Sequence, residues 1–508
     1  MEQALKITIV GGGSAGWLSA GLIASQNPNV QVSLIESANI PTIGVGEGTW
    51  PSMRETLSKI GIDENQFLAF TNASFKQGSQ FVNWHKPNSN YYHPFTQPIN
   101  YYQLNLGPYW QPHADKVNFA AAVSSQVAVC DANLAPKTTI QKPYQGSLNY
   151  GYHLDAVKFA QLLTQHCTQV LKVEHIIGDV VAITNDNLGY IKQVQLECGN
   201  TIKGDLFIDC TGSKSLLLNK HYGVEFKGLE HVLLNDSAVA AQQPYQDPQQ
   251  EIVSHTISTA TDIGWIWDIG LQNRRGTGHV FSSKHASFEQ AKDELKAYLG
   301  DEQEQLSYRH IQFKPGHHKT FWHKNCVAIG MSAGFIEPLE ASALALIEQG
   351  ANLVANQLPQ DRSHMQMLAD IYNHTMLRHW QDIIEFLKLH YVLSTNDSDY
   401  WQAQKHQDSI PTSLQQKLAL WRYQLPHVMP NQYNYNLFPS ASYLYVLLGM
   451  GWQLNNTVNN PKLQAMANQS FNDNVRQTNR LLSMLPSNRQ LLNHLTNNQN
   501  NKSGTDND

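Results

Sequence analysis

The stretch Lys6-Ile-Thr-Ile-Val-Gly-Gly-Gly-Ser-Ala-Gly16 decides the fold of this chain of 508 residues. Lys6 to Val10 is a short β-rich run, Gly11 to Gly16 is a glycine turn, and Trp17 to Ser25 has a helical composition. A second apolar run follows from Val30 to Ile35. Strand, tight turn, helix and strand in this order predict a βαβ unit.

The glycine turn satisfies the pattern G-x-G-x-x-G, which gains specificity here because it follows a strand and opens a helix. Gly11 permits the tight turn, Gly13 lets the backbone approach a pyrophosphate, and Gly16 lets the helix pack on the strand. Glu36 ends the second strand and would accept hydrogen bonds from a ribose. The sequence therefore predicts a dinucleotide site rather than an empty structural turn. Its predicted cofactor-binding residues are Gly11, Gly13, Ser14, Ala15 and Gly16, and the start of the helix offers N–H groups to the phosphates.

A second glycine element and two later strand ends favour FAD over NAD. The element Ile43 to Gly48 comes soon after Glu36, where a flavoprotein can contact its cofactor again. Asp205 to Gly212 and Cys326 to Gly330 each place an apolar strand before a glycine. Strand ends that return to one nucleotide are typical of large flavoproteins. The further predicted FAD contacts are Val45, Gly46, Glu47, Val180, Asp209, Gly330 and Met331.

Composition argues against several classes of protein. The net charge of -6 does not resemble a nucleic-acid-binding surface. No run of about 18 apolar residues predicts a membrane span, and the N-terminus lacks a signal-peptide pattern. The five cysteines are scattered without CxxC pairs, which favours a cytoplasmic protein without a metal. His310, His317, His318 and His323 have no standard ligand spacing, so a polar loop is the preferred interpretation.

The predicted fold class is α/β (α+β overall), with a discontinuous FAD-binding module. Helical periodicity over Tyr152 to Leu171 and from Glu340 to Leu358 separates strand-rich parts. We expect an FAD module over 1–50, 150–222 and 325–360, and an interleaved substrate module over 51–149 and 223–324. A helical C-terminal part over 361–492 and a disordered tail over 493–508 complete the prediction.

Motifs along most of the chain resemble the flavin-dependent tryptophan halogenase family. They include GGGSAGW, GVGEGTWP, FKQGSQFVNW, YYHPF, YHLDAVKFA, GWIWDI and GFIEPLEASAL. The resemblance implies a Rossmann-like FAD-binding box of the hydroxylase type with a substrate module. It also implies a halogenase that receives reduced FAD from a separate flavin reductase. Such an enzyme makes hypohalous acid from O2 and chloride or bromide, and the acid travels through a tunnel to a lysine beside a small aromatic substrate. The resemblance leaves a homodimer possible and implies no nucleic-acid or membrane partner.

Residue by residue, the resemblance assigns the catalytic lysine to Lys76 and the catalytic carboxylate to Glu340, with Glu337 as the main competitor. Taken without the family, Lys76 would be a solvent-facing lysine and Glu340 an acid in the first turn of a helix. The ammonium of Lys76 would bind hypohalous acid, or its neutral amine would form a haloamine. The halide positions are Ser342 and Ala343, and the resemblance places Leu344 against the flavin ring of FAD.

The resemblance also assigns the substrate walls. His93 and Phe95 match residues that enclose the substrate ring, and Trp265 and Trp267 match a pair that separates substrate from flavin. On a strand that tryptophan pair shares one face and could equally be core. The matched lid, Ser440 to Trp452, lacks an acidic clamp for an amino-acid ammonium, which makes free tryptophan a doubtful substrate.

The chain departs from the family pattern at Gly270, where the motif has proline, and at Ala341 and Ala343, which stand beside the predicted halide. These departures bear on halide preference and rate. Two other functions stay open at this stage. One is a flavin-dependent aromatic monooxygenase, and the other is a non-catalytic flavin-binding protein.

Overall fold

The structure is a computed structural model that describes residues 4–40, 46–427, 437–455 and 460–503. Contacts divide the chain into two compact units, each assembled from three segments. Unit 1 comprises Met1–Asn72, Leu154–Leu229 and Lys314–Trp380. Unit 2 comprises Ala73–His153, Glu230–Phe313 and Gln381–Asp508. No helix in the described ranges is long and apolar enough to cross a membrane.

Unit 1 is built on a six-stranded sheet in the order β20-β21-β12-β1-β2-β8. The neighbours from β21 to β8 are parallel, and only β20 runs antiparallel to its neighbour. The strands are β1 (Lys6–Val10), β2 (Gln31–Glu36), β8 (Glu174–Ile177), β12 (Leu206–Asp209), β20 (Trp322–His323) and β21 (Cys326–Ala328). The predicted βαβ opening is confirmed. From β1 the sheet continues with β2 and β8 on one side and with β12 and β21 on the other. Ligands bind at such a switch point in open α/β sheets.

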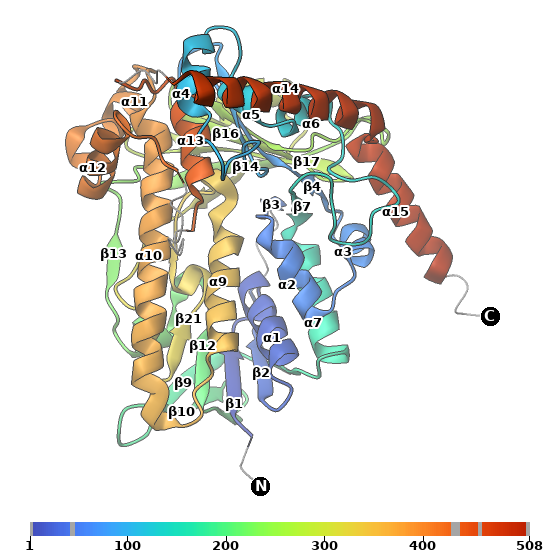
Figure 1. The fold of residues 1–508 in the computed structure, drawn as a ribbon. Helices are drawn as coiled ribbons and strands as arrows, with labels where there is room; N and C mark the ends of the chain where they lie inside the picture. Colours follow the sequence, from blue (N-terminus) through green and yellow to red (C-terminus); the bar gives the residue numbers. More distant parts are fainter. Residues whose placement is uncertain (1–3, 41–45, 428–436, 456–459, 504–508) are drawn as a thin grey trace. The chain divides into compact units, whose positions relative to one another are not determined.

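Helices of unit 1 pack around α1 (Ser14–Gln26), which contacts α7 (Ala156–Gln169) and α9 (Ser342–Asn356) (Figure 1). The helix α2 (Ser52–Ile60) also packs on α1: a Cβ at Gly21 would lie 3.2 Å from the side chain of Ile60. Residues 51–72 therefore belong to unit 1 by their contacts, although the sequence placed them in the substrate module. A separate sheet of β9 (Val180–Asn185), β10 (Ile191–Leu196) and β11 (Thr201–Lys203) forms the connection between the strands β8 and β12.

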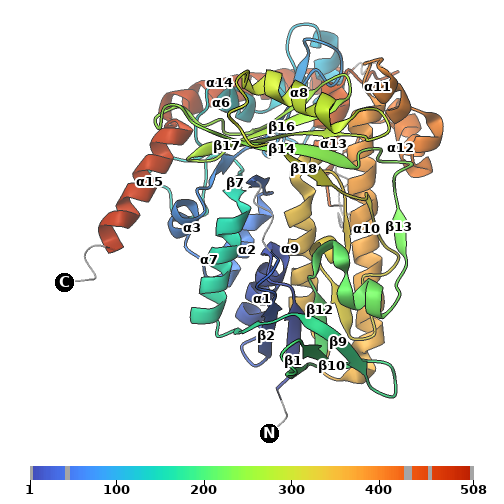
Figure 2. The ribbon, with the colours of Figure 1, turned by 180° about the vertical axis from the view of Figure 1, so that it is seen from behind.

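Unit 2 is built on a seven-stranded sheet in the order β18-β14-β17-β16-β15-β5-β6. Every neighbouring pair is antiparallel except β5 and β15. The strands are β5 (Gly78–Val82), β6 (Asn90–Pro94), β14 (Ser237–Pro244), β15 (Thr256–Ala260), β16 (Gly264–Gly270), β17 (Arg274–Phe281) and β18 (Arg309–Gln312). The amphipathic helix α8 (Phe288–Leu299) begins at a capping box on Ser287 and packs on β14 and β17 (Figure 2). Its buried Ala291, Leu295 and Leu299 join Val239 and Ile266 in one core.

The C-terminal part is helical, as predicted. Its helices are α10 (Met365–Val392), α11 (Asp399–Gln404), α12 (Thr412–Trp421), α13 (Ser440–Gly449), α14 (Pro461–Met484) and α15 (Asn488–Ser503). The prediction of a disordered tail over 493–508 is wrong for residues 493–503, because α15 continues through Ser503. The start of this helix is anchored by the buried side chains of Leu491 and Leu492. The guanidinium of Arg489 also donates to the backbone carbonyl oxygens of Gln250 and Gln272. Residues 504–508 lie outside the described residues.

Candidate functional site

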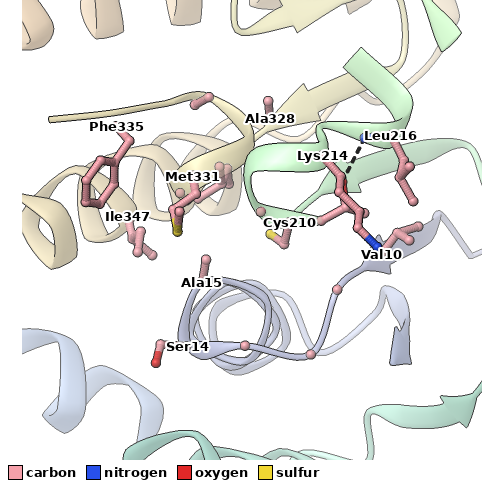
Figure 3. Close-up of a pocket in the computed structure, with 18 of the residues that line it drawn as sticks. Val10, Ser14, Ala15, Cys210, Lys214, Leu216, Ala328, Met331, Phe335 and Ile347 are labelled. Atoms are coloured by element: carbon pink, nitrogen blue, oxygen red, sulfur yellow. Dashed lines mark hydrogen bonds between the residues drawn. The ribbon is translucent and has the colours of Figure 1, made fainter. Parts of the chain in front are cut away.

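Unit 1 contains a cavity of about 510 Å³ at the carboxyl ends of β1, β2, β12 and β21 (Figure 3). One end is formed by Val10 and the glycine turn, and the other by Met331, Phe335 and Ile347. The cavity therefore offers backbone groups at one end and apolar side chains at the other.

The fingerprint glycines have two different tasks. Gly11 has φ +115°, and a Cβ there would lie 2.1 Å from the carbonyl oxygen of Cys210. A Cβ at Gly16 would lie 1.8 Å from the carbonyl oxygen of Gly11. A Cβ at Gly13 would meet no described atom within 4 Å, although Gly13 lines the cavity. Gly11 and Gly16 thus permit close backbone packing, whereas the bare backbone of Gly13 leaves space for a ligand.

The N-terminus of α1 is suited to an anion. Its N-cap is Gly13, and in the described structure no side chain caps it and no acid stands in its first turn. By contrast, Asp155 caps α7 with its carboxylate. The unsatisfied N–H groups and the positive end of the helix dipole at Ser14 and Ala15 therefore face the cavity, where they can bind phosphate.

Glu36 lies across the glycine turn. A Cβ at Gly12 would lie 2.2 Å from the carboxyl carbon of Glu36, and His175 Nε2 lies 2.9 Å from Glu36 Oε2. The carboxylate lines the cavity wall at the end of β2. This is the position expected for an acceptor of the ribose hydroxyls.

The structure places most of the predicted cofactor residues on this cavity, namely Gly11, Gly13, Ser14, Ala15, Glu36, Glu47, Val180, Gly330, Met331 and Leu344. Of the other described residues, Gly16, Gly46 and Asp209 do not line it, and Val45 lies outside the described residues. Desolvation raises the pKa of the Glu47 carboxyl to about 7.

Asp209 supports the cavity instead of lining it. Its buried carboxylate accepts hydrogen bonds from the backbone N–H groups of Thr211, Leu217 and Leu218 at 2.8–3.0 Å. These bonds hold the loop that follows β12, which supplies lining residues that the sequence prediction missed: Cys210, Thr211, Lys214 and Leu216. Their signal was their place directly after a strand that ends at the switch point.

The turn before α9 carries the predicted carboxylate. Glu340 has φ 64° and Ala341 has φ 55°, so the two lie in the left-handed region and precede the helix. The expectation that Glu340 stands in the first helical turn is therefore wrong. Each left-handed residue other than glycine costs roughly 1–2 kcal/mol, which the surrounding structure must offset. The indole Nε1 of Trp50 donates to the Glu340 carbonyl oxygen at 2.7 Å. Glu337 is buried on the same loop.

Lys76 lies in unit 2, on β4 (Ser74–Lys76), and is only 1% exposed. Its ammonium nitrogen lies 5.3 Å from the centre of the Phe95 ring. The strand β4 pairs with β7 (Gly151–Asp155), which places His153 opposite Ser74 on the face shared with Lys76. Burial, together with the positive charge of Lys76, holds the pKa of His153 well below its usual value. The solvent-facing alternative for Lys76 is therefore wrong.

Of the predicted aromatic residues of unit 2, His93 lies on β6, Phe95 directly follows that strand, and Trp265 and Trp267 lie on β16. His93 Nε2 lies 2.9 Å from Ser442 Oγ of α13, and its ring contacts Phe386. Trp265 is 1% exposed and packs on Trp84. The core interpretation therefore fits Trp265.

Trp267 occupies a different environment from Trp265. The pair share one face of β16, with their rings 6.4 Å apart. The ring of Trp267 lies over Gly278, where a Cβ would come within 2.1 Å of it.

Comparisons with known proteins agree with this geometry. The family model described as tryptophan halogenase matches residues 6–468. The chain belongs to the tryptophan halogenase family. A tryptophan 6-halogenase of Streptomyces toxytricini is 33% identical over 88% of this chain and 89% of its own. The solved structure of a tryptophan halogenase from Shewanella frigidimarina is 47% identical, covers 98% of both chains and has a TM-score of 0.93. A flavin-dependent halogenase from Brevundimonas sp. is 30% identical, covers 97% of this chain and 99% of its own, and has a TM-score of 0.85.

This halogenase is a flavin-dependent enzyme, and its cavity fits FAD. The open space at Gly13 and the uncapped start of α1 suit a pyrophosphate, and Glu36 suits a ribose. The apolar end around Met331, Phe335 and Ile347 suits a flat flavin ring.

One further expectation is tested by the halogenase structure. The segment Ser440 to Trp452 was expected to be a lid, but α13 is mostly buried, and Tyr445 Oη donates to the Thr96 carbonyl oxygen at 2.8 Å. No group of three or more His, Cys, Asp or Glu side chains in the described ranges could hold a metal ion. His317 and His318 instead hydrogen-bond backbone carbonyl groups.

Proposed function

We propose that this enzyme halogenates an electron-rich aromatic substrate of the indole type, with Lys76 and Glu340 as its catalytic residues. The observation that carries the proposal is the burial of the Lys76 ammonium beside the Phe95 ring. Burying an ammonium costs several kcal/mol, and such costly groups cluster at functional sites. When bound, reduced FAD from a separate reductase supplies the electrons that turn O2, halide and a proton into hypohalous acid and water.

The halide site is proposed at Ser342 and Ala343. The helix α9 begins without a side-chain cap or an acid in its first turn, as far as the described residues show. Ser342 Oγ is buried and has no hydrogen-bond partner in the described part of the chain. Ala343 and Leu344 line the FAD cavity. N–H groups and a hydroxyl of this kind can hold chloride or bromide beside a flavin.

Lys76 and Glu340 serve the transfer step. Lys76 donates a hydrogen bond to hypohalous acid, or forms a haloamine when neutral, and the halogen passes to the ring carbon. The carbon–hydrogen bond becomes a carbon–halogen bond, and Glu340 takes the ring proton. In the direct route the hydroxide of hypohalous acid takes a proton from the Lys76 ammonium and leaves as water, and the proton on Glu340 restores the ammonium. In the haloamine route the water forms when the amine is halogenated. His93 and Phe95, with Trp265 and Trp267, are the proposed walls for the substrate.

Free tryptophan is not the proposed preferred substrate. The contact of α13 with His93 is made by the neutral hydroxyl of Ser442, and the sequence of α13 contains no acid. We therefore expect indole to react at least as well as tryptophan. Bromide should react at least as well as chloride, since bromide is more easily oxidised.

The test supplies the purified enzyme with a flavin reductase, NADH, FAD and indole, with and without halide. A halogenated product that disappears without halide is expected. A halide-independent hydroxylated product would identify an aromatic monooxygenase, and stoichiometric FAD binding without turnover would identify a non-catalytic protein. A competition between equal indole and tryptophan tests the substrate, and exclusive chlorination of tryptophan would refute the preference.

The carboxylate assignment has its own test. Glu340→Gln keeps the shape of the side chain but removes its basicity, so turnover should fall by roughly 10²–10⁴-fold. Glu337→Gln is the matched control, because Glu337 is buried on the same loop. An active Glu340→Gln variant beside an inactive Glu337→Gln variant would reverse the assignment.

A further inference from the structure

A tryptophan outside the assigned site contacts the catalytic turn. The indole N–H of Trp50 donates to the carbonyl oxygen of Glu340 at 2.7 Å, across 290 residues of sequence. Both residues belong to unit 1. The indole has only one polar hydrogen, so this bond uses its whole donor capacity.

The bonded carbonyl belongs to the peptide between the two left-handed residues Glu340 and Ala341. The N–H of the same peptide, on Ala341, donates to the Pro338 carbonyl oxygen at 2.9 Å. One peptide plane is thus held from both sides, by Trp50 and by the loop itself. Its orientation determines the direction in which the Glu340 side chain leaves the backbone.

Trp50 is itself held relative to α9. Two residues further along, Ser52 Oγ donates to the Glu348 carboxylate of α9 at 3.1 Å, and Thr56 Oγ1 donates to it at 2.5 Å. Burial raises the pKa of Glu348 to about 7. Three hydrogen bonds therefore connect the start of α2 with the turn and the body of α9.

We infer that Trp50 is a positioning residue for the halogenation reaction, because its indole N–H fixes the Glu340–Ala341 peptide and hence the direction of the Glu340 carboxylate. The inference rests on the proposed catalytic role of Glu340. Trp50 does not line the FAD cavity in the described structure, so it acts on the carboxylate and not on the cofactor.

The test replaces Trp50 by Phe, which keeps an aromatic ring and removes the N–H. A misplaced catalytic group costs roughly 10- to 100-fold in rate, so kcat should fall by that factor. The KM for indole and the Kd for FAD should change less than about two-fold. Trp17→Phe is the matched control, because Trp17 is a buried indole of unit 1 whose Nε1 has no hydrogen-bond partner among the described residues. Wild-type kcat in Trp50→Phe would overturn the inference.

A double-mutant cycle separates positioning from general damage. In the Glu340→Gln background, Trp50→Phe should cause little further loss, because Trp50 acts through that carboxylate. An equal loss in both backgrounds would overturn the inference and leave the role of Glu340 standing. Full activity of Glu340→Gln alone would refute the proposed catalytic role of Glu340, and the inference with it.

A second variant covers the case in which Trp50→Phe does not fold. Incorporation of 3-benzothienylalanine at position 50 replaces the N–H by sulfur and nearly preserves the shape of the indole. The same fall in kcat is expected, with an unchanged Kd for FAD. Wild-type kcat in this variant would overturn the inference equally.

Discussion

Replacement of Lys76 by methionine separates chemistry from packing at the buried lysine. Methionine fills much of the same volume but carries no charge and no N–H donor. Because Lys76 is 1% exposed, its ammonium carries a desolvation cost that Lys76→Met removes. The variant keeps the aliphatic packing of the side chain, so it should fold, while halogenation falls by roughly 10²–10⁴-fold.

Lys76→Ala should lose the same activity but also stability. Relative to methionine, alanine lacks three heavy-atom groups in a buried position, and each contributes about 0.8 kcal/mol. The free energy of unfolding of Lys76→Ala should thus lie about 2–3 kcal/mol below that of Lys76→Met. The difference shows how much an alanine variant alone would confuse loss of packing with loss of catalysis.

Three measurements check this reasoning: urea unfolding, FAD titration and the rate of halogenated product. Flavin affinity should be unchanged in both variants, since Lys76 lies in unit 2 and the described FAD cavity is built from unit 1. The pKa of His153 should rise when the charge of Lys76 is removed, yet stay low because burial is the larger cause. A rate within ten-fold of wild type in Lys76→Met would refute the catalytic role of the lysine.

Three other predictions concern unit 1. Gly13→Ala should fold normally, since its Cβ meets no described atom, but its FAD affinity should fall by at least about ten-fold. Gly11→Ala should instead unfold at a lower urea concentration, because its Cβ meets the Cys210 carbonyl oxygen. Normal flavin binding by Gly13→Ala would contradict this reasoning. The Glu47 carboxyl lines the cavity and has a pKa near 7, so above that pH it should put a negative charge in the site of the anionic FAD. The Kd for FAD should therefore rise through pH 7 in wild type and stay flat in Glu47→Gln; parallel curves would be the contrary result. The pKa of buried Glu348 is raised from 4.5 to about 7, so between pH 4.5 and pH 7 the folded state binds more protons than the unfolded state. The free energy of unfolding of wild type should therefore fall as pH rises through this range, by about 3 kcal/mol relative to Glu348→Gln. Urea unfolding of both proteins from pH 4.5 to 8 measures this difference, and a constant difference would show that Glu348 does not titrate there.

The local sequence determined the elements that carry the cofactor site. The glycine turn, the strand before it and Glu36 form one βαβ unit, because tight turns, helix starts and alternating apolar residues depend on neighbours along the chain. The motif resemblance correctly indicated the family and its flavin chemistry, and the shared order of motifs placed Lys76 and Glu340 as candidates.

Only the tertiary structure decided the burial, the hydrogen bonds and the packing partners of those residues. The sequence could not show that Asp209 supports a loop instead of lining the cavity, or that Trp265 packs on Trp84. Nor could it show that Glu340 has a left-handed backbone conformation before α9, or that Trp50 donates a hydrogen bond to the Glu340 carbonyl oxygen. Each of these facts depends on contacts between residues far apart in the chain. Burial, hydrogen bonding and desolvation arise only when such distant segments pack together, so no local pattern encodes them by itself.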